Sequence, residues 1–311
     1  MGELCLVTGG AGFIGSHLVE GLTAAGQCVR VFDNFCTGQR GNLAEIRPAP
    51  EVVEGDVGDG AAVEAAIKGV NVVYHLAALA SVQQSVEKPA NTHHTCSTGT
   101  LNVLDAARRQ GVRRVVYAAS SSAYGIPAGD VQTELDPVAP LSPYAAAKLA
   151  GELYLQAFAA TYGLETVRLR FFNIYGPRQR ADSPYSGVIA LFAAALGSGK
   201  TPTIFGDGLQ SRDFTFVTDV VQALQKAAAV PGISGRVYNI GTGKSVNLLE
   251  LLTELNRLMG TKVTAQHAPP RAGDVRHSRA DITRARQALG YEPRVAFADG
   301  LASTLKWMRQ Q

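Results

Sequence analysis

The stretch LCLVTGGAGFIGSHL, residues 4–18, decides the fold class of this chain of 311 residues. Its apolar start predicts a short buried strand, and three glycines then lead into a helical pattern over residues 13–25. Gly9 permits a tight turn, Gly12 lets a phosphate approach the backbone, and Gly15 allows close contact between helix and strand. A strand, a glycine turn and a helix in this order indicate the first unit of a dinucleotide-binding α/β sheet.

The same alternation of strand and helix continues through the first half of the chain. Strand-like runs lie at 29–32, 51–54, 72–76, 115–118 and 165–169, and helical patterns at 60–68, 97–110 and 142–162. The alternation predicts an α/β fold with a doubly wound, parallel Rossmann-type sheet that helices cover on both faces. We expect residues 1–173 to form the cofactor-binding domain, to which the chain returns around 214–240 with a strand at 236–240.

The composition of the chain changes after about residue 174. Gly, Pro, Ser and Arg become dense, and short helical patterns follow near 187–197, 218–229, 247–259, 281–288 and 299–309. Residues 174–311 are therefore predicted to form mainly a smaller C-terminal cap that binds the substrate.

Composition and charge exclude several classes of protein. Hydrophobic residues make up 46% and charged residues 18% of the chain, which excludes intrinsic disorder. The net charge of +3 favours neither a nucleic acid nor a membrane surface as a partner. The four cysteines show no CxxC spacing, so we expect no metal site and a reducing, cytoplasmic location. No signal peptide or long apolar stretch is visible.

The residues after the first strands predict the cofactor. Asp33 ends the second strand, where a carboxylate can hold the ribose hydroxyls of NAD and would repel the 2′-phosphate of NADP. Asp56 is expected to face the adenine or, alternatively, to cap its loop, and His75 to be a partly buried histidine with satisfied hydrogen bonds. The full set expected to contact NAD is Gly9, Gly12, Phe13, Ile14, Gly15, Asp33, Asn34, Thr37, Gly38, Asp56, Val57, Leu76, Ala77, Ala78, Tyr144 and Lys148.

Tyr144 and Lys148 form a candidate catalytic pair. They are four residues apart in a helical pattern and therefore share one face. A lysine cation and the positive nicotinamide would favour the phenolate and suit Tyr144 to act as a general base. Ser120–Ser122 follow the fifth strand, where a hydroxyl can share the proton. The alternatives are a surface helix pair and ordinary turn chemistry for the serines.

Motifs along the whole chain resemble those of the extended short-chain dehydrogenase/reductase family. These motifs are GGAGFIG at 9–15, HLAA at 75–78, SSSAYG at 120–125 and YAAAK at 144–148. The later motifs resemble nucleotide-sugar 4-epimerases of the UDP-N-acetylglucosamine/UDP-glucose branch, namely FFNIYGPRQ at 171–179, SPYSGVI at 183–189, FGDGLQSRDF at 205–214 and RAGDVRHSRAD at 271–281. The resemblance implies that the protein inverts C4 of a UDP-hexose through a transient 4-keto sugar, with bound NAD as hydride shuttle.

The resemblance also implies roles for individual residues. The catalytic residues would be Tyr144 as base, Lys148, Ser120 and Ser122, and the substrate contacts Ser120, Ser121, Asn173, Val188, Phe205, Arg212, Arg271, Asp274 and Ser278. Among the latter, Asn173, Arg212 and Arg271 would hold the diphosphate, Asp274 the uridine ribose, and Val188 and Phe205 the uracil. A small Ser278 would leave room for a 2-N-acetyl group, or it simply caps the helix after Ala280. Arg178 stays open between a structural role and a substrate contact.

Some alternatives and departures remain at this stage. Cys96 stands where the family usually has an asparagine, and His93 and His94 are interpreted as helix-start residues. The related 4,6-dehydratases have acidic residues where this chain has Ser121 and Ser122, which argues against dehydration. A UDP-glucuronate 4-epimerase, another nucleotide-sugar oxidoreductase or dehydratase, and an NAD-sensing regulator are the rival functions. The resemblance further implies a homodimer through a four-helix bundle of helices 97–110 and 142–162.

Overall fold

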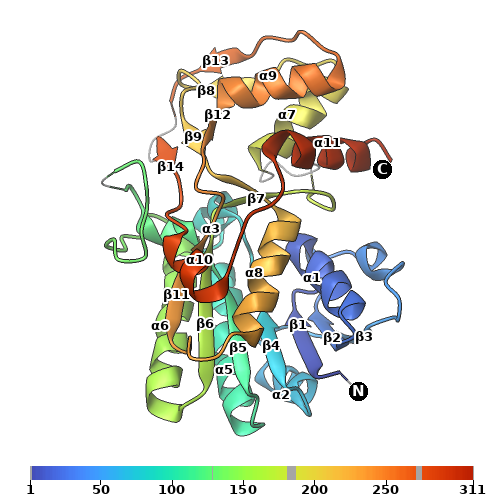
Figure 1. The fold of residues 1–311 in the computed structure, drawn as a ribbon, viewed down its shortest axis with the longest axis vertical. Helices are drawn as coiled ribbons and strands as arrows, with labels where there is room; N and C mark the ends of the chain where they lie inside the picture. Colours follow the sequence, from blue (N-terminus) through green and yellow to red (C-terminus); the bar gives the residue numbers. More distant parts are fainter. Residues whose placement is uncertain (1, 128, 181–186, 271–274, 311) are drawn as a thin grey trace.

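A seven-stranded parallel sheet forms the lower part of the molecule in Figure 1, which confirms the predicted doubly wound α/β fold. The computed structural model describes residues 2–127, 129–180, 187–270 and 275–310. In pairing order, the strands are β11 (Arg236–Ile240), β6 (Glu165–Phe171), β5 (Arg114–Ser120), β4 (Val72–His75), β1 (Leu4–Thr8), β2 (Cys28–Asp33) and β3 (Glu51–Glu54). The chain leaves β1 toward β2 and later returns to the other side of β1 with β4, so the topological switch point lies there.

Helices cover both faces of this sheet and bury a separate apolar core on each. One face is covered by α1 (Phe13–Ala24), α8 (Val217–Ala229) and α10 (Thr283–Leu289), and the other by α2 (Gly60–Ile67), α5 (Gly99–Arg109) and α6 (Pro143–Tyr162). Because both faces are covered, the central strands are buried along most of their length: every residue of β4 is buried. The predicted strands and helices all form, with ends that differ by a few residues, except that the helix predicted for 97–110 begins earlier.

β5 begins earlier than its apolar run indicated, because a charged residue is buried in it. Arg114 is only 2% exposed. Its Nη1 donates to the carbonyl oxygens of Ala227, Ala228 and Val230 at the end of α8, and its guanidinium forms an ion pair with Glu165. These partners come from distant parts of the chain, so a local pattern could not indicate them.

The interpretation of His93 and His94 as helix-start residues was wrong. The helix begins at Pro89 with α4 (Pro89–His93), passes through a π-helical turn η2 (His94–Thr98) and continues as α5. A proline suits the first helical position, which explains the earlier start. Cys96 in this π-helical turn is buried, and the turn packs against α6.

The elements of the C-terminal part gather above the carboxyl ends of the sheet (Figure 1). Their helices α7 (Val188–Gly197), α9 (Leu248–Met259) and α11 (Phe297–Met308) enclose a third apolar core, which includes Leu251, Leu255 and Leu301. Short strands complete this part: β7 (Asn173–Tyr175) with β10 (Phe214–Phe216), β8 (Thr203–Phe205) with β13 (Gln266–Ala268), and β9 (Ser211–Arg212) between β12 (Val246–Asn247) and β14 (His277–Ser278). The remaining short helices are η1 (Arg40–Leu43), α3 (Val82–Glu87) and η3 (Ser121–Tyr124).

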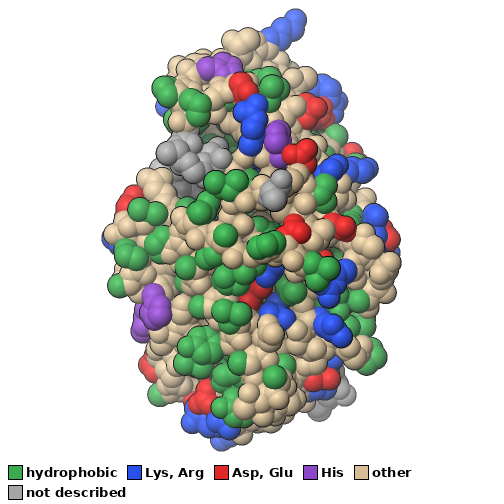
Figure 2. Space-filling model, turned by 90° about the vertical axis from the view of Figure 1, so that its left-hand side faces the viewer, with side chains coloured by type: hydrophobic (Ala, Val, Ile, Leu, Met, Phe, Trp, Pro, Cys, Tyr) green, Lys and Arg blue, Asp and Glu red, His purple; other side chains and the backbone are tan. Residues whose placement is uncertain are grey.

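The surface is mixed in charge. On the face drawn in Figure 2, basic and acidic side chains are interspersed and do not gather into one patch of a single sign. Along the described parts of the chain, no helix combines the length and apolarity needed to cross a membrane. The described His, Cys, Asp and Glu side chains likewise form no group of three that could hold a metal ion.

Candidate active site

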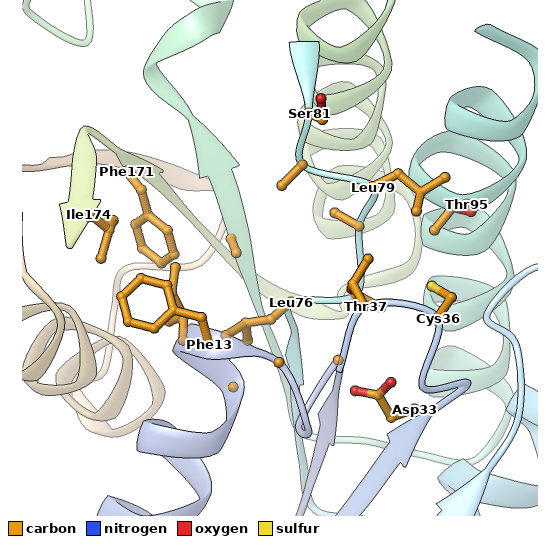
Figure 3. Close-up of a pocket in the computed structure, with 18 of the residues that line it drawn as sticks. Phe13, Asp33, Cys36, Thr37, Leu76, Leu79, Ser81, Thr95, Phe171 and Ile174 are labelled. Carbon is orange, nitrogen blue, oxygen red and sulfur yellow. The ribbon is translucent and has the colours of Figure 1, made fainter. Parts of the chain in front are cut away.

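A cavity of about 520 Å³ lies beyond the carboxyl ends of the central strands. Its wall includes Gly9 after β1, Asp33 at the end of β2, Leu76 after β4 and Ser120 at the end of β5. A doubly wound sheet binds its ligands at this edge because the loops diverge on either side of the switch point. Figure 3 shows Phe13, Phe171 and Ile174 on one side of the pocket, and Asp33, Cys36 and Thr37 on the other.

The glycine loop lies in the middle of this cavity. Gly9 has φ +69°, and a Cβ there would approach the backbone nitrogen of Ala77 to 2.8 Å. A Cβ at Gly15 would lie 2.1 Å from the carbonyl oxygen of Gly9, so only glycine allows this contact between turn and helix. Gly12 precedes α1, whose first turn has no acidic residue. The N–H groups of that turn and the helix dipole therefore favour an anion in the cavity.

Asp33 marks one end of the cavity. Its carboxylate accepts hydrogen bonds from the backbone nitrogens of Ala11 (2.9 Å) and Phe35 (2.8 Å), which hold it at the end of β2. Asp56, in contrast, accepts from Asn34 Nδ2 (2.7 Å) and from the backbone nitrogen of Gly58 (2.7 Å), and so caps its own loop. Of the residues predicted to contact NAD, all line this cavity except Asp56 and Gly38.

Ser120, Tyr144 and Lys148 come together at the other end of the cavity. α6 begins directly before the pair because the Ser142 hydroxyl accepts from the backbone nitrogen of Ala145 (3.2 Å) and a proline occupies the first helical position. Ser120 Oγ is hydrogen-bonded to Ser122 Oγ at 2.8 Å. Ser121 and Ser122 follow in η3 and, among the described residues, lie outside the cavity wall.

Burial sets the protonation of the tyrosine and the lysine. It raises the pKa of Tyr144 to about 12, Cys96 adds to this increase, and a hydrogen bond with Ser120 opposes it. Burial lowers the pKa of Lys148 to about 8, while Cys96 and Glu152 act in the opposite direction. The Lys148 ammonium lies 4.2 Å from the centre of the Tyr117 ring, a cation–π contact that stabilises its charge.

His75 lies beneath this end of the cavity and is fully buried, more so than the sequence indicated. Its Nδ1 is hydrogen-bonded to Thr8 Oγ1 (2.8 Å) and its Nε2 to Thr100 Oγ1 (3.0 Å). Burial, followed by the charge of Lys148, lowers the pKa of His75 to about 3, so the ring is neutral. Thr8 Oγ1 also accepts from the backbone nitrogen of Ala77 (3.2 Å), so the histidine supports the wall of the cavity.

Several predicted substrate residues gather around the short strands above the cavity. Ser278 in β14 pairs directly with Arg212 in β9, and the backbone nitrogen of Asn173 in β7 donates to the oxygen of Asp213 (3.1 Å). The alternative that Ser278 caps a helix was wrong, because α10 begins only at Thr283. Ser278 instead belongs to the short strand β14, which pairs with β9. Each of these strands has only two residues, too few for a periodic sequence pattern to indicate them.

The other predicted substrate residues are more dispersed. Val188 begins α7 and packs against the core of the C-terminal part, and Phe205 ends β8 half-buried. Arg271 and Asp274 lie outside the described residues. Among the residues that are described, Asn173, Val188, Phe205, Arg212 and Ser278 do not line the cavity that holds Tyr144.

Sequence reasoning missed part of the cavity wall. Ser81 and Gln84 line it from the start of α3, and Thr95 lines it from the π-helical turn. Arg178, whose role was left open, also lines it. The Ser81 hydroxyl accepts from the backbone nitrogen of Gln84, a helix-start signal that is visible in the sequence, whereas the position of Thr95 depends on the π-helical turn.

Comparisons with known proteins agree with this geometry. Residues 5–241 match the model of the NAD dependent epimerase/dehydratase family. The chain is 42% identical to the UDP-glucose 4-epimerase of Mycolicibacterium smegmatis over 98% of both proteins. It also resembles the crystal structure of a UDP-glucose 4-epimerase from Thermotoga maritima with UDP-glucose, with a TM-score of 0.94 and 38% identity over 99% of both chains. A UDP-N-acetylglucosamine 4-epimerase from Methanobrevibacter ruminantium, in complex with UDP-N-acetylmuramic acid, gives a TM-score of 0.95 at 35% identity over the full length of both chains.

Proposed function

Because the chain belongs to the NAD dependent epimerase/dehydratase family, we propose that it catalyses the 4-epimerisation of a UDP-hexose with bound NAD. One observation supports this most strongly: Ser120, Tyr144 and Lys148 meet at one end of a cavity whose middle is the glycine loop. UDP-glucose and UDP-N-acetylglucosamine are the proposed substrates, since a UDP-glucose 4-epimerase and a UDP-N-acetylglucosamine 4-epimerase each match nearly the whole chain.

The cavity has the features that NAD requires. A Cβ at Gly9 or Gly15 would collide with the backbone of the turn. Because both residues are glycines, the loop can keep this close turn and leave its backbone N–H groups open to a diphosphate at the start of α1. Asp33 would hold the adenosine ribose, and Tyr144 and Lys148 the nicotinamide end. When bound there, NAD supplies the acceptor and donor of the hydride at the sugar C4.

The residues at the nicotinamide end would move the proton. Tyr144 would take the proton of the sugar 4-hydroxyl through its hydrogen bond with Ser120, which already lowers the pKa of the phenol. A positive charge bound beside Tyr144 would lower that pKa further from about 12. Ser122 holds the Ser120 hydroxyl in place at 2.8 Å. Hydroxyls at Ser121 and Ser122 offer no acid for eliminating water, which disfavours a dehydratase.

Substrate recognition would come from the C-terminal part. Arg212 and Asn173 would hold the diphosphate, together with Arg271, and Asp274 the uridine. Ser278 would lie beside the 2-substituent of the sugar and would limit the space for it. Because Ser278 pairs with Arg212, this space would be linked to the position of the diphosphate. With this division, residues 1–173 and the returning segment 214–240, which contains α8 and β11, form the cofactor part, and the remainder forms mainly the cap.

Product analysis tests the proposal. The purified protein is incubated separately with UDP-glucose and UDP-N-acetylglucosamine, and the 4-epimers are resolved by chromatography. We expect an epimer from at least one of them; no epimer from either would refute the proposed reaction. Tyr144→Phe should lower turnover at least 100-fold, a loss typical of removing a general base. Tyr162→Phe, at the exposed end of the same helix, is the matched control and should leave turnover unchanged.

We also propose a homodimer in which α5 and α6 of two copies form a four-helix bundle. On α6, Leu153 and Tyr154 are 57% and 40% exposed, and burial of apolar side chains would favour association. Light scattering after size exclusion tests this: a monomer at micromolar concentration would contradict it, and Leu153→Asp should dissociate the dimer.

A further inference from the structure

The turn after β7 contains a strained arginine. Arg178 has φ +67°, and it and Phe35 are the non-glycine residues with positive φ in the described chain. The left-handed region costs a non-glycine residue about 1 kcal/mol or more, and glycine or asparagine adopts it more readily. A long charged side chain at this position therefore indicates a role of the guanidinium beyond forming the turn.

The guanidinium is held against α1. Arg178 Nη2 lies 2.8 Å from Glu20 Oε2, and Nη1 donates to Ser16 Oγ at 3.4 Å. Next to it, His17 Nε2 donates to the carbonyl oxygen of Pro177 at 2.9 Å. Three contacts, from Ser16, His17 and Glu20 on neighbouring turns of α1, thus fasten this segment to the helix whose N-terminus opens into the cavity. A guanidinium has five N–H donors, and these two bonds leave donors for a ligand.

The position of Arg178 suits a phosphate. The residue lines the same cavity as Gly12 and Phe13, where α1 begins. Because the first turn of α1 has no acidic residue, a diphosphate there would meet the helix N-terminus and, from the flank, the guanidinium. Arginine binds phosphate oxygens through two parallel hydrogen bonds and is always charged.

We propose that Arg178 binds the diphosphate of the dinucleotide and retains the cofactor in the cavity. The proposal rests on the proposed use of NAD. Glu20 and Ser16 orient the side chain, and the hydrogen bond from His17 to the backbone of Pro177 keeps the turn in place. Retention matters for the proposed reaction because the cofactor is regenerated in each cycle and need not leave. Arg178 is thus a cofactor-binding residue that links the turn before the cap to the glycine loop.

Binding of two probes tests the proposal without catalysis. ADP-ribose has the diphosphate, and adenosine lacks it. Calorimetry measures the binding of each probe to the unaltered whole protein, freed of cofactor, and to the variants Arg178→Asn and Arg178→Gly. Asparagine and glycine both adopt positive φ readily, so these variants preserve the turn. We expect the variants to bind ADP-ribose about tenfold or more weakly, a change of ~1.4 kcal/mol per tenfold, and to bind adenosine unchanged. Arg178→Lys, which keeps the charge, should recover part of the loss.

The controls separate the possible outcomes. Arg257→Asn makes the same change on exposed α9 and should change neither probe. Raising the salt concentration should weaken ADP-ribose binding more in the unaltered protein than in Arg178→Asn, because the lost contact is ionic. Unchanged ADP-ribose binding in both variants, or equal losses for ADP-ribose and adenosine, would overturn the assignment and indicate a purely structural turn. Failure of the unaltered protein to bind ADP-ribose would instead refute the proposed cofactor site itself.

Discussion

The buried ion pair between Arg170 and Glu152 gives the sharpest stability prediction. Their side chains are 6% and 1% exposed. Arg170 Nε lies 3.0 Å and 3.1 Å from the two carboxylate oxygens, and Nη2 lies 2.8 Å from Oε2. Glu152→Gln removes the negative charge and leaves the guanidinium buried without it. Breaking a buried pair on one side costs about 3–5 kcal/mol, and at roughly 2 °C per kcal/mol for a chain of this size Tm should fall by about 6–10 °C.

Urea unfolding followed by circular dichroism measures this loss. The matched control is Glu254→Gln, which breaks the exposed pair with Arg257 and should cost less than about 1 kcal/mol. Replacing both partners, as in Glu152→Met with Arg170→Met, should recover most of the stability because no charge is left buried. The reasoning is refuted if Glu152→Gln costs no more than Glu254→Gln, or if the double replacement is as unstable as the single one.

Three further predictions concern the cofactor loop, the lysine and the sugar pocket. Gly15→Ala should abolish measurable NAD binding in calorimetry, since its Cβ would lie 2.1 Å from the oxygen of Gly9, whereas Gly41→Ala meets nothing within 4 Å and should bind normally. The pKa of Lys148 is lowered from 10.5 to about 8. Between pH 8 and pH 10.5 this amine therefore binds more protons in the unfolded chain than in the folded protein, and the contribution of Lys148 to the free energy of unfolding rises with pH. Lys148→Met should remove this rise, at most about 3 kcal/mol, and identical pH profiles of urea unfolding in both proteins would contradict it. Ser278→Tyr should abolish conversion of the acetylated UDP-sugar and spare UDP-glucose; full conversion of both would show that this side chain does not limit the pocket.

Local patterns predicted the cofactor half well because its signals are short in range. The glycine spacing around Gly9 and Gly15 and the four-residue spacing of Tyr144 and Lys148 are properties of single turns and single helices. Apolar runs located the central strands of the main sheet because both of their faces are buried. Where a residue depended on distant partners, as Arg114 does on the carbonyl oxygens at the end of α8, the local pattern placed the start of the strand too late.

The sequence by itself determined the fold class, the glycine cradle and the residue types of the proton-transferring pair, since each follows from the order and spacing of neighbouring residues. Only the tertiary structure decided what meets at the cavity. It brought Ser120 to Tyr144, which lie on different elements, and it buried Lys148 and so lowered its pKa to about 8. It also placed Arg178 against α1, 158 residues away from Glu20 in the chain. Such contacts depend on how the elements pack, because burial and charge act through space and not along the chain.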